Sequence, residues 1–246
     1  MEGIHFRLLA WHARVPLASC AKWLPPSQAR PGNLVDAAAA MRHLPMMTAR
    51  RLGVGDRLVV DGVLSLLADQ AADALVLCSQ HGELERNDRI LQSLAADQPV
   101  SPTDFTMSVH NAAAGTCTIV AGQPLVSTSL SAGADTFQQA LFEVMGFFQA
   151  GHRRVILADF EGHIPAFYQR QAGVVLPVAP YAVCLLLVPG TDWRCQPRPL
   201  GPASAVRVST PGVLPQSLQW LRALVQGRDA HAVQGQSHEW HWSHTP

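Results

Sequence analysis

Short apolar runs alternate with stretches of helical periodicity along this chain. Residues 4–11, 74–78, 154–158 and 182–188 are apolar runs of strand length, and 74–78 and 182–188 are apolar throughout. Such runs predict strands, and the two fully apolar ones predict strands buried on both faces. Residues 125–128 and 205–209 are further predicted strands. Helical spacing of apolar residues predicts helices at 48–70, 84–96, 134–150 and 214–226. This alternation predicts an α/β fold whose mixed sheet is covered by helices.

The segment that begins at Ser101 has the clearest helix start in the chain. Ser101 can accept a hydrogen bond from a free backbone amide, Pro102 has no amide hydrogen to lose, and Asp104 favours the positive helix end. We expect this helix to run to about Ala114. Later in the chain, 189–202 is rich in proline and is expected to be a surface excursion. Trp240 and Trp242 suggest a last edge strand.

Charged residues are scarce in this chain. Lys plus Arg number 18 and Asp plus Glu number 18, which is 15% of the residues and gives zero net charge, while 48% are hydrophobic. An average soluble domain has roughly 25% charged residues. We therefore expect another chain to cover part of the apolar surface. Zero net charge without a basic block argues against nucleic-acid binding, and the high apolar content argues against disorder.

Membrane and secretion signals are also missing from the sequence. No stretch reaches the roughly 20 apolar residues of a membrane span, and the nearest candidate, 174–188, contains two prolines. The start lacks the basic and apolar regions of a signal peptide. Five cysteines without a Cys-x-x-Cys pair favour reduced thiols. These features predict a cytoplasmic protein.

Few residues form a recognisable catalytic or metal-binding motif. The common nucleotide, hydrolase and metalloprotease motifs are absent, and no cofactor is expected. In a strand, His238 and His244 would face one side and His241 the other, so packing of the tryptophans is favoured over a metal site. Cys117 lies seven residues after His110, on the same face of the predicted helix. Cysteine among small residues is more often packing than catalysis, so a structural role is favoured there too.

Three segments resemble the N-terminal part of β-ketoacyl synthases. They are SPTDFTMSVHNAAAG (101–115), GQPLVSTSLSAGADTFQQAL (122–141) and GHRRVILADFEG (151–162). Residues 44–52 and 74–86 are similar as well, so the resemblance covers most of the chain. It is strongest to the short synthase-like proteins of aryl polyene and related type II polyketide or fatty-acid systems. The resemblance implies a thiolase-like half-fold with a mixed five-stranded-type sheet, in which residues 1–246 form one domain that lacks the C-terminal catalytic half.

The resemblance also implies that the catalytic nucleophile is missing. In these synthases a cysteine stands in a sharp turn between a strand and the N-terminus of a buried helix, where the helix dipole lowers the thiol pKa. That position falls at Leu130 here, with Ser129 beside it. Two histidines of the catalytic half have no counterpart. We therefore expect an inactive synthase homologue and not an enzyme.

The expected function is that of a chain length factor, which pairs with an active β-ketoacyl synthase and shapes its acyl tunnel. Acyl carrier protein would take part indirectly. One alternative is an acyltransferase or thioesterase that uses Ser129 or Cys117, and another is a homodimeric scaffold. By analogy with the synthases, the residues expected at the partner interface or acyl tunnel are Phe105, Met107, Val109, His110, Asn111, Leu125, Val126, Ser127 and Thr128.

Overall fold

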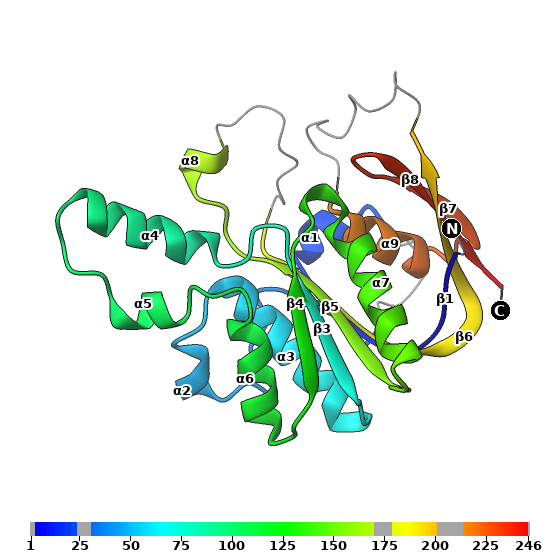
Figure 1. Cartoon of the computed structure of the whole chain (residues 1–246), viewed down its shortest axis with the longest axis horizontal. Coiled ribbons are helices and arrows are strands. Elements are labelled where there is room, and N and C mark those ends of the chain that lie inside the picture. Colours follow the sequence, from blue (N-terminus) through cyan, green and yellow to red (C-terminus); the bar gives the residue numbers. More distant parts are fainter. Residues whose placement is uncertain (1–2, 24–30, 170–178, 201–213, 246) are drawn as a thin grey trace.

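A mixed sheet runs through the computed structural model, which describes residues 3–23, 31–169, 179–200 and 214–245 (Figure 1). Its elements, in chain order, are β1 (Ile4–Val15), α1 (Leu17–Cys20), β2 (Leu34–Asp36), α2 (Met46–Ala49), α3 (Val54–Asp69), β3 (Ala74–Cys78), α4 (Leu84–Ala95), α5 (Pro102–Thr106), α6 (Ala112–Ala121), β4 (Val126–Leu130), the 3₁₀ turn η1 (Gly133–Asp135), α7 (Thr136–Gln149), β5 (Val155–Glu161), α8 (Ala166–Gln169), β6 (Tyr181–Pro199), α9 (Gln216–Val225), β7 (Ala230–Gln234) and β8 (His238–His244).

The sheet has eight strands among the described residues, and five of them form its centre. These five lie in the order β1-β6-β5-β3-β4, with β3 parallel to β4 and β5, and with β6 antiparallel to β1 and β5. β2 joins the outer side of β1, while β8 joins the second half of β6 and in turn pairs with β7. The predicted α/β class with a mixed sheet is confirmed.

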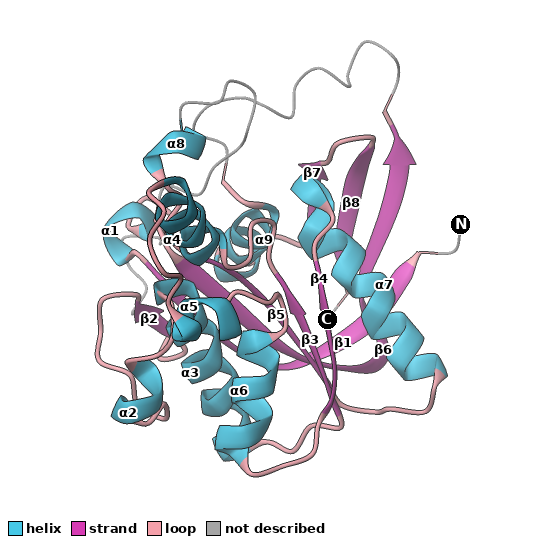
Figure 2. Ribbon diagram, turned by 60° about the vertical axis from the view of Figure 1, so that its left-hand side comes forward, coloured by secondary structure: helices cyan, strands magenta, loops and turns pink. Residues whose placement is uncertain are grey.

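Helices cover the sheet on both faces, with α3 and α6 on one side and α7 on the other (Figure 2). Successive residues of a strand point to opposite faces. In β3, Ala74, Val76 and Cys78 accordingly join the core under α7 and α9, while Leu75 and Leu77 join the core under α3 and α6. Full burial of a Leu or Val side chain contributes roughly 1.5–3 kcal/mol. The two cores explain why β3 is apolar at every position.

Several predicted boundaries are confirmed and others shift. The strand at 74–78 and the helices at 84–96 and 214–226 agree with β3, α4 and α9 to within two residues. The helix predicted over 48–70 begins only at Val54, because Gly53 has extended backbone (φ −61°, ψ 169°) and stands at the helix N-cap. The strand predicted over 205–209 lies outside the described residues.

The single helix predicted from Ser101 to about Ala114 is wrong. Its start is confirmed, since the Ser101 hydroxyl accepts a hydrogen bond from the Asp104 amide at 3.3 Å. The helix ends at Thr106, and a second one begins only at Ala112. Between them the Ser108 hydroxyl donates to the Phe105 carbonyl at 2.8 Å. Serine side chains compete in this way with helical hydrogen bonds, which favours a turn.

The surface excursion predicted over 189–202 is also wrong, because β6 continues to Pro199. Its second half pairs with β8, in which Trp240 lies opposite Pro197. β1 begins at Ile4, opposite Cys195, so the described chain leaves the β1 side of β6 unpaired beyond that point. Proline is tolerated at such an edge because no ladder hydrogen bond is lost. β8 itself is not an edge strand, since β7 pairs with its other side.

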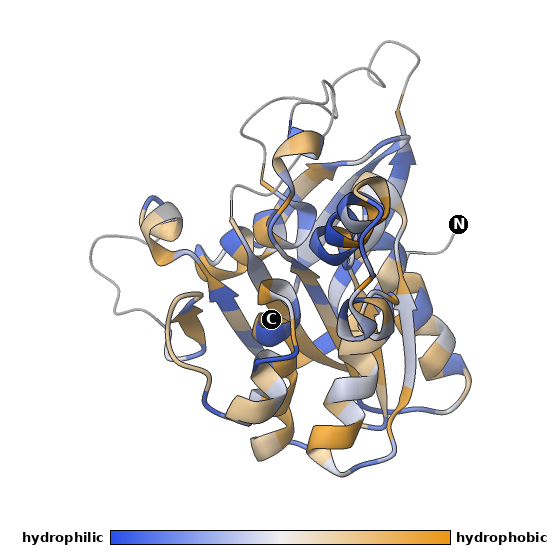
Figure 3. Cartoon of the chain, turned by 90° about the vertical axis from the view of Figure 1, so that its left-hand side faces the viewer, coloured by the Kyte–Doolittle hydropathy of each residue, from blue (hydrophilic) through white to orange (hydrophobic). Residues whose placement is uncertain are grey.

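Two helices leave the body of the molecule. α4 and α5 pack on each other and form an arm, residues 84–106, which projects at the left of Figure 1. Leu91 and Leu94 of α4 and Phe105 of α5 are exposed there. In Figure 3, which looks onto this end of the molecule, apolar and polar segments alternate along the helices. None of the helices in the described ranges is long and apolar enough to cross a bilayer.

Candidate functional site

A tight turn joins β4 to α7 at the carboxyl end of the parallel strands. Gly133 has φ +60°, a left-handed conformation that other residues rarely adopt. The Thr136 hydroxyl donates to the Gly133 carbonyl at 2.7 Å and accepts from the Ala132 amide at 2.9 Å. Asp135 is buried and accepts hydrogen bonds from Gln216 Nε2, the Gln236 amide and Trp240 Nε1. Hydrogen bonds within the turn, and others from α9 and from the hairpin of β7 and β8, therefore hold it in place.

Leu130 is the last residue of β4, and its side chain packs partly buried against the core under α7. The residues directly before α7 are Gly133, Ala134 and Asp135. Helix amides and the helix dipole act on a group only within the first turn. Near that first turn, Leu130, Gly133 and Ala134 carry no nucleophilic atom. The Ser131 hydroxyl donates to the Gln80 carbonyl at 3.0 Å, and the Asp135 carboxylate and the Thr136 hydroxyl are held by the hydrogen bonds described above.

The two alternative nucleophiles are held in unreactive surroundings. Ser129 pairs with Leu77 of β3, and its buried hydroxyl has no hydrogen-bond partner within the described ranges. Cys117 is fully buried in α6, and burial raises the pKa of its thiol far above the ordinary value. His110 precedes α6 instead of sharing a helix with Cys117, so the predicted common face is wrong. Both imidazole nitrogens of His110 are buried and have no hydrogen-bond partner among the described residues, and the ring lies beside Gly82.

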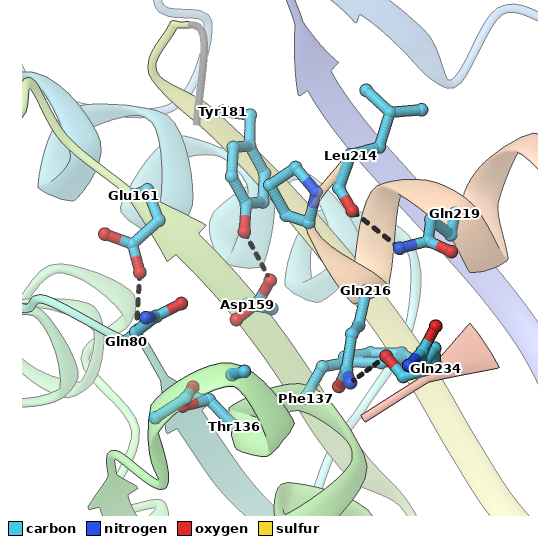
Figure 4. Close-up of a pocket in the computed structure, with 13 residues that line it drawn as sticks. Gln80, Thr136, Phe137, Asp159, Glu161, Tyr181, Leu214, Gln216, Gln219 and Gln234 are labelled. Atoms are coloured by element: carbon cyan, nitrogen blue, oxygen red, sulfur yellow. Dashed lines mark hydrogen bonds between the residues drawn. The ribbon is translucent and has the colours of Figure 1, made fainter. Parts of the chain in front are cut away.

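A small polar cavity of about 50 Å³ lies under the N-terminus of α7, between α7, α9 and the ends of β5 and β6. Figure 4 shows Asp159 and Tyr181 facing each other at this cavity. Tyr181 donates to Asp159 Oδ2 at 2.9 Å, and the Ser217 hydroxyl donates to the same oxygen. Burial raises the pKa of Asp159 to about 7, although the bond from Ser217 opposes this rise. A volume of about 50 Å³ holds a few water molecules.

Glu161, at the end of β5, ties the loop after β3 to the same cavity. Its Oε1 accepts from the Ser79 hydroxyl at 3.1 Å and from the Gln80 and His81 amides. Its Oε2 lies 3.1 Å from His81 Nδ1. No sequence pattern predicted a role for Asp159, Glu161, Tyr181 or Ser217. The sequence feature that could have indicated this site is the pair of carboxylates in ADFEG (158–162), two acidic side chains at the end of an otherwise apolar strand.

The residues predicted at the partner interface differ in exposure. β4 is the last strand on its side of the sheet and, in the described chain, pairs only with β3. Phe105 is 69% exposed, and Val109 and Val126 are each 51% exposed. Asn111 and Ser127 are exposed, Thr128, Met107 and His110 are half-buried, and Leu125 is buried. Ile119 of α6, which the sequence analysis missed, is 81% exposed. α6 and β4 thus leave apolar side chains open beside an unpaired strand edge.

The histidines of the C-terminal strand do not converge. His241 Nε2 lies 2.6 Å from Oε2 of Glu239 in the same strand, whereas the His244 ring stacks on Trp193. Trp240 and Trp242 are buried in the core, as predicted for this segment. Within the described ranges, no group of three His, Cys, Asp or Glu residues is placed to hold a metal ion.

The strand, tight turn and helix at β4 and α7, set in a mixed sheet between helical layers, define a thiolase-like ketosynthase fold. The chain belongs to the β-ketoacyl synthase family. Residues 22–243 match the family described as beta-ketoacyl synthase, N-terminal domain. The resemblance found in the sequence is thereby confirmed.

Two solved structures illustrate this membership. The chain is 42% identical to a chain of the ketosynthase ApeO in complex with its chain length factor ApeC from Xenorhabdus doucetiae. That match covers 97% of this chain and 99% of the other, with a TM-score of 0.83. The ishigamide ketosynthase/chain length factor is similar in fold only, with 16% identity, a TM-score of 0.58, and coverage of 81% of this chain and 68% of that one. No match was found among curated proteins.

Proposed function

We propose that this chain is a non-catalytic partner subunit, a chain length factor, that pairs with an active β-ketoacyl synthase. The observation that carries the proposal is the turn between β4 and α7. From Ser129 to Thr136 this turn contains no thiol, and its Ser131 and Thr136 hydroxyls donate to the Gln80 and Gly133 carbonyls. Without a thiol at that place, the domain lacks the nucleophile with which a synthase would form its acyl-enzyme.

The match to the ApeO–ApeC complex supports a paired role. This chain and the matched one correspond over nearly their full lengths, and that structure is described as a ketosynthase with its chain length factor. An aryl polyene or related polyketide pathway, which the resemblance of the sequence implies, is the setting proposed for this pair. The open β4 edge beside Val126 and Ile119 supports the same role, because an unpaired strand edge is a template for pairing with another chain.

Within the pair, Phe105, Met107 and His110 are proposed to close or line the acyl tunnel. They belong to the arm and the turn that follows it, next to the apolar face of α6. Replacing Met107 by Ala would lengthen the tunnel if its side chain limits the acyl chain. The measurement is the mass distribution of products made by the reconstituted synthase pair. An unchanged distribution for Met107→Ala and Phe105→Ala would contradict the tunnel role.

Co-expression with an active β-ketoacyl synthase from the same organism tests the pairing itself. We expect the two chains to migrate together on size exclusion, and Ile119→Asp with Val126→Asp to separate them. Leu9→Asp is a matched control, since Leu9 is an exposed apolar residue on β1, away from α6 and β4. Separate migration of the unmodified chains contradicts the proposal, and a stable homodimer alone would favour the scaffold instead.

Intact mass after incubation with an acyl carrier thioester tests the lack of catalysis. We expect no covalent acyl adduct on this chain. An adduct that disappears in Ser129→Ala or Cys117→Ala would overturn the proposal in favour of an acyltransferase or thioesterase.

A further inference from the structure

The arm is attached to the body through one buried arginine. Arg86 of α4 is 5% exposed. Its Nε donates to Glu83 Oε2 at 3.0 Å, its Nη1 donates to Asp104 Oδ1 of α5 at 2.9 Å, and its Nη2 donates to the Arg51 carbonyl before α3. One guanidinium therefore connects the two helices of the arm with the body.

A second buried carboxyl group lies behind this arginine. Asp56, in the first turn of α3, is 1% exposed and lies beside Glu83, which is 9% exposed. A Cβ on Gly53 would lie 3.5 Å from Glu83 Oε2 and 3.7 Å from Asp56 Oδ2. Neither Asp56 oxygen accepts a hydrogen bond from a donor among the described residues. Ionised carboxylates are acceptors only. Two adjacent buried carboxyl groups, one of them without a donor, are therefore stabilised by a proton between them.

The backbone on the body side of the pair is closely packed. A Cβ on Gly55 would lie 2.7 Å from the Gly162 amide nitrogen, so α3 and the loop after β5 touch backbone to backbone. The cavity beside the pair is only about 20 Å³. Solvent therefore has little access with which to replace a lost hydrogen bond between Asp56 and Glu83.

We propose that Asp56 and Glu83 share one proton and that this proton holds the arm against the body. Losing it would place two like charges in contact beside one arginine, and the root of the arm would open. The effect on partner pairing rests on the proposed function, because the arm carries Phe105 and leads to Val109. The sharing of the proton and the closure of the root stand on this chain alone.

Charges on all neighbouring elements act on the pair. Burial is the largest influence and raises the pKa of Glu83 to about 9, with Asp56 adding to the rise and Arg86 opposing it. Burial also raises the pKa of Asp56, against the opposing effects of Arg86 and Arg57. Other titratable groups also lie near the root: Arg50 and Arg51 before α3, Glu85 and Arg89 of α4, Asp104 of α5, Cys117 of α6 and His163 after β5.

The sign of the pH dependence follows from the raised pKa. The folded chain keeps a proton that the unfolded chain releases near its ordinary value of 4.5. This contribution to stability is therefore complete at low pH and is lost as pH rises from about 4.5 to about 9. Glu83→Gln removes the titration but keeps an amide that can donate to Asp56 and accept from Arg86.

Urea unfolding of the full chain at pH 6 to 8.5 tests the shared proton. We expect the unfolding equilibrium constant of the unmodified chain, relative to that of Glu83→Gln, to rise up to about tenfold per pH unit. Glu85→Gln is the matched control, because Glu85 is 42% exposed on the same helix, and its profile should follow that of the unmodified chain. A ratio to Glu83→Gln that does not change with pH would overturn the proposal.

Hydrogen–deuterium exchange tests the link to the arm, after correction for the intrinsic rate at each pH. We expect amides of residues 84–106 to lose protection between pH 6.5 and 8.5 in the unmodified chain and to keep it in Glu83→Gln. Unchanged arm protection would refute the link even if the unfolding data agree. Neither measurement uses the synthase, so a failure here is separate from a failure of the proposed function.

Discussion

The two ends of this molecule cover their apolar side chains in different ways. At the end formed by β6, β7, β8 and α9, the rings of Trp193 and Trp220 lie 5.2 Å apart and those of Trp220 and Trp242 6.0 Å apart, all buried. At the end formed by the arm, α6 and β4, Phe105 and Ile119 are mostly exposed. The first end is closed by the chain's own C-terminal hairpin, whereas the second has no such cover among the described residues.

The scarcity of charge is concentrated at α6 and β4. No Asp, Glu, Lys or Arg occurs from residue 105 to residue 134, so polar cover is short on that part of the open end, whereas the helix α4 of the arm is rich in charge. An exposed apolar patch of this kind marks an interaction surface or an aggregation risk. We therefore expect self-association or poor solubility when the chain is made alone. A monomeric chain at high concentration, measured by light scattering, would contradict this expectation.

The largest effect on stability is expected at the closed end. Trp220→Ala removes a side chain that is fully buried among other aromatic rings. Such a cavity costs about 3–5 kcal/mol in the free energy of unfolding. Urea unfolding measures the loss, with Phe105→Ala at the open end as the control that should change little. Equal losses of unfolding free energy in the two variants would contradict the proposed difference between the closed and the open end.

Asp159 at the closed end gives a second pH test. Its pKa is raised from 3.8 to about 7, so the folded chain binds a proton that the unfolded chain releases. Stability should therefore fall as pH rises from about 4 to about 7, by at most about tenfold in the unfolding constant per unit. Asp159→Asn should flatten this part of the profile. If the stability of Asp159→Asn changes with pH in the same way as that of the unmodified chain, Asp159 is not the titrating group.

A smaller effect is expected for pairing at the open end. Phe105→Ala should leave unfolding nearly unchanged and weaken binding to the synthase by roughly tenfold or more, as for a buried aromatic anchor. Binding measured by calorimetry or by co-elution at decreasing concentration checks this. Leu9→Ala, an exposed apolar residue on β1, is the control and should bind normally. Equal affinities for both variants would remove Phe105 from the interface.

The smallest effect concerns the tip of the arm. Ser101→Ala removes the hydroxyl that accepts from the Asp104 amide at the start of α5. Loss of an N-cap costs about 1 kcal/mol. Because α5 is short, the loss should appear as faster amide exchange at residues 102–106 with little change in global unfolding. A global loss comparable to that of Trp220→Ala would mean that the arm is part of the core.

Much of the fold could be predicted because its signals are local. The apolar run at 74–78 and the serine, proline and aspartate at 101–104 each carry their physical cause within a few residues. The β6 extension could not be predicted in this way. Prolines ordinarily disfavour a strand, and only the distant end of β1 makes them acceptable at 197 and 199.

The site was predictable in outline and not in detail. The segments after 101 led to the family, and the absence of cysteine at the turn is visible in the sequence. The contacts of Asp159 with Tyr181 and Ser217 join residues 22 and 58 positions apart, which no local pattern encodes. The same holds for Asp56 and Glu83, whose partnership depends on how α3 and α4 pack.

The pairing of β1 with β6 has a consequence for the order of folding. Ile4 lies opposite Cys195, so a strand synthesised first gains its antiparallel neighbour only when the second half of the chain is available. Until then β1, apolar over much of its length, has only the three-residue strand β2 beside it among the described strands. Closing so long a segment makes folding slow, because the entropy of closure is lost before the contacts form. The nascent chain therefore carries an open strand until β6 is made, and truncation before β6 or slow elongation should lead to aggregation.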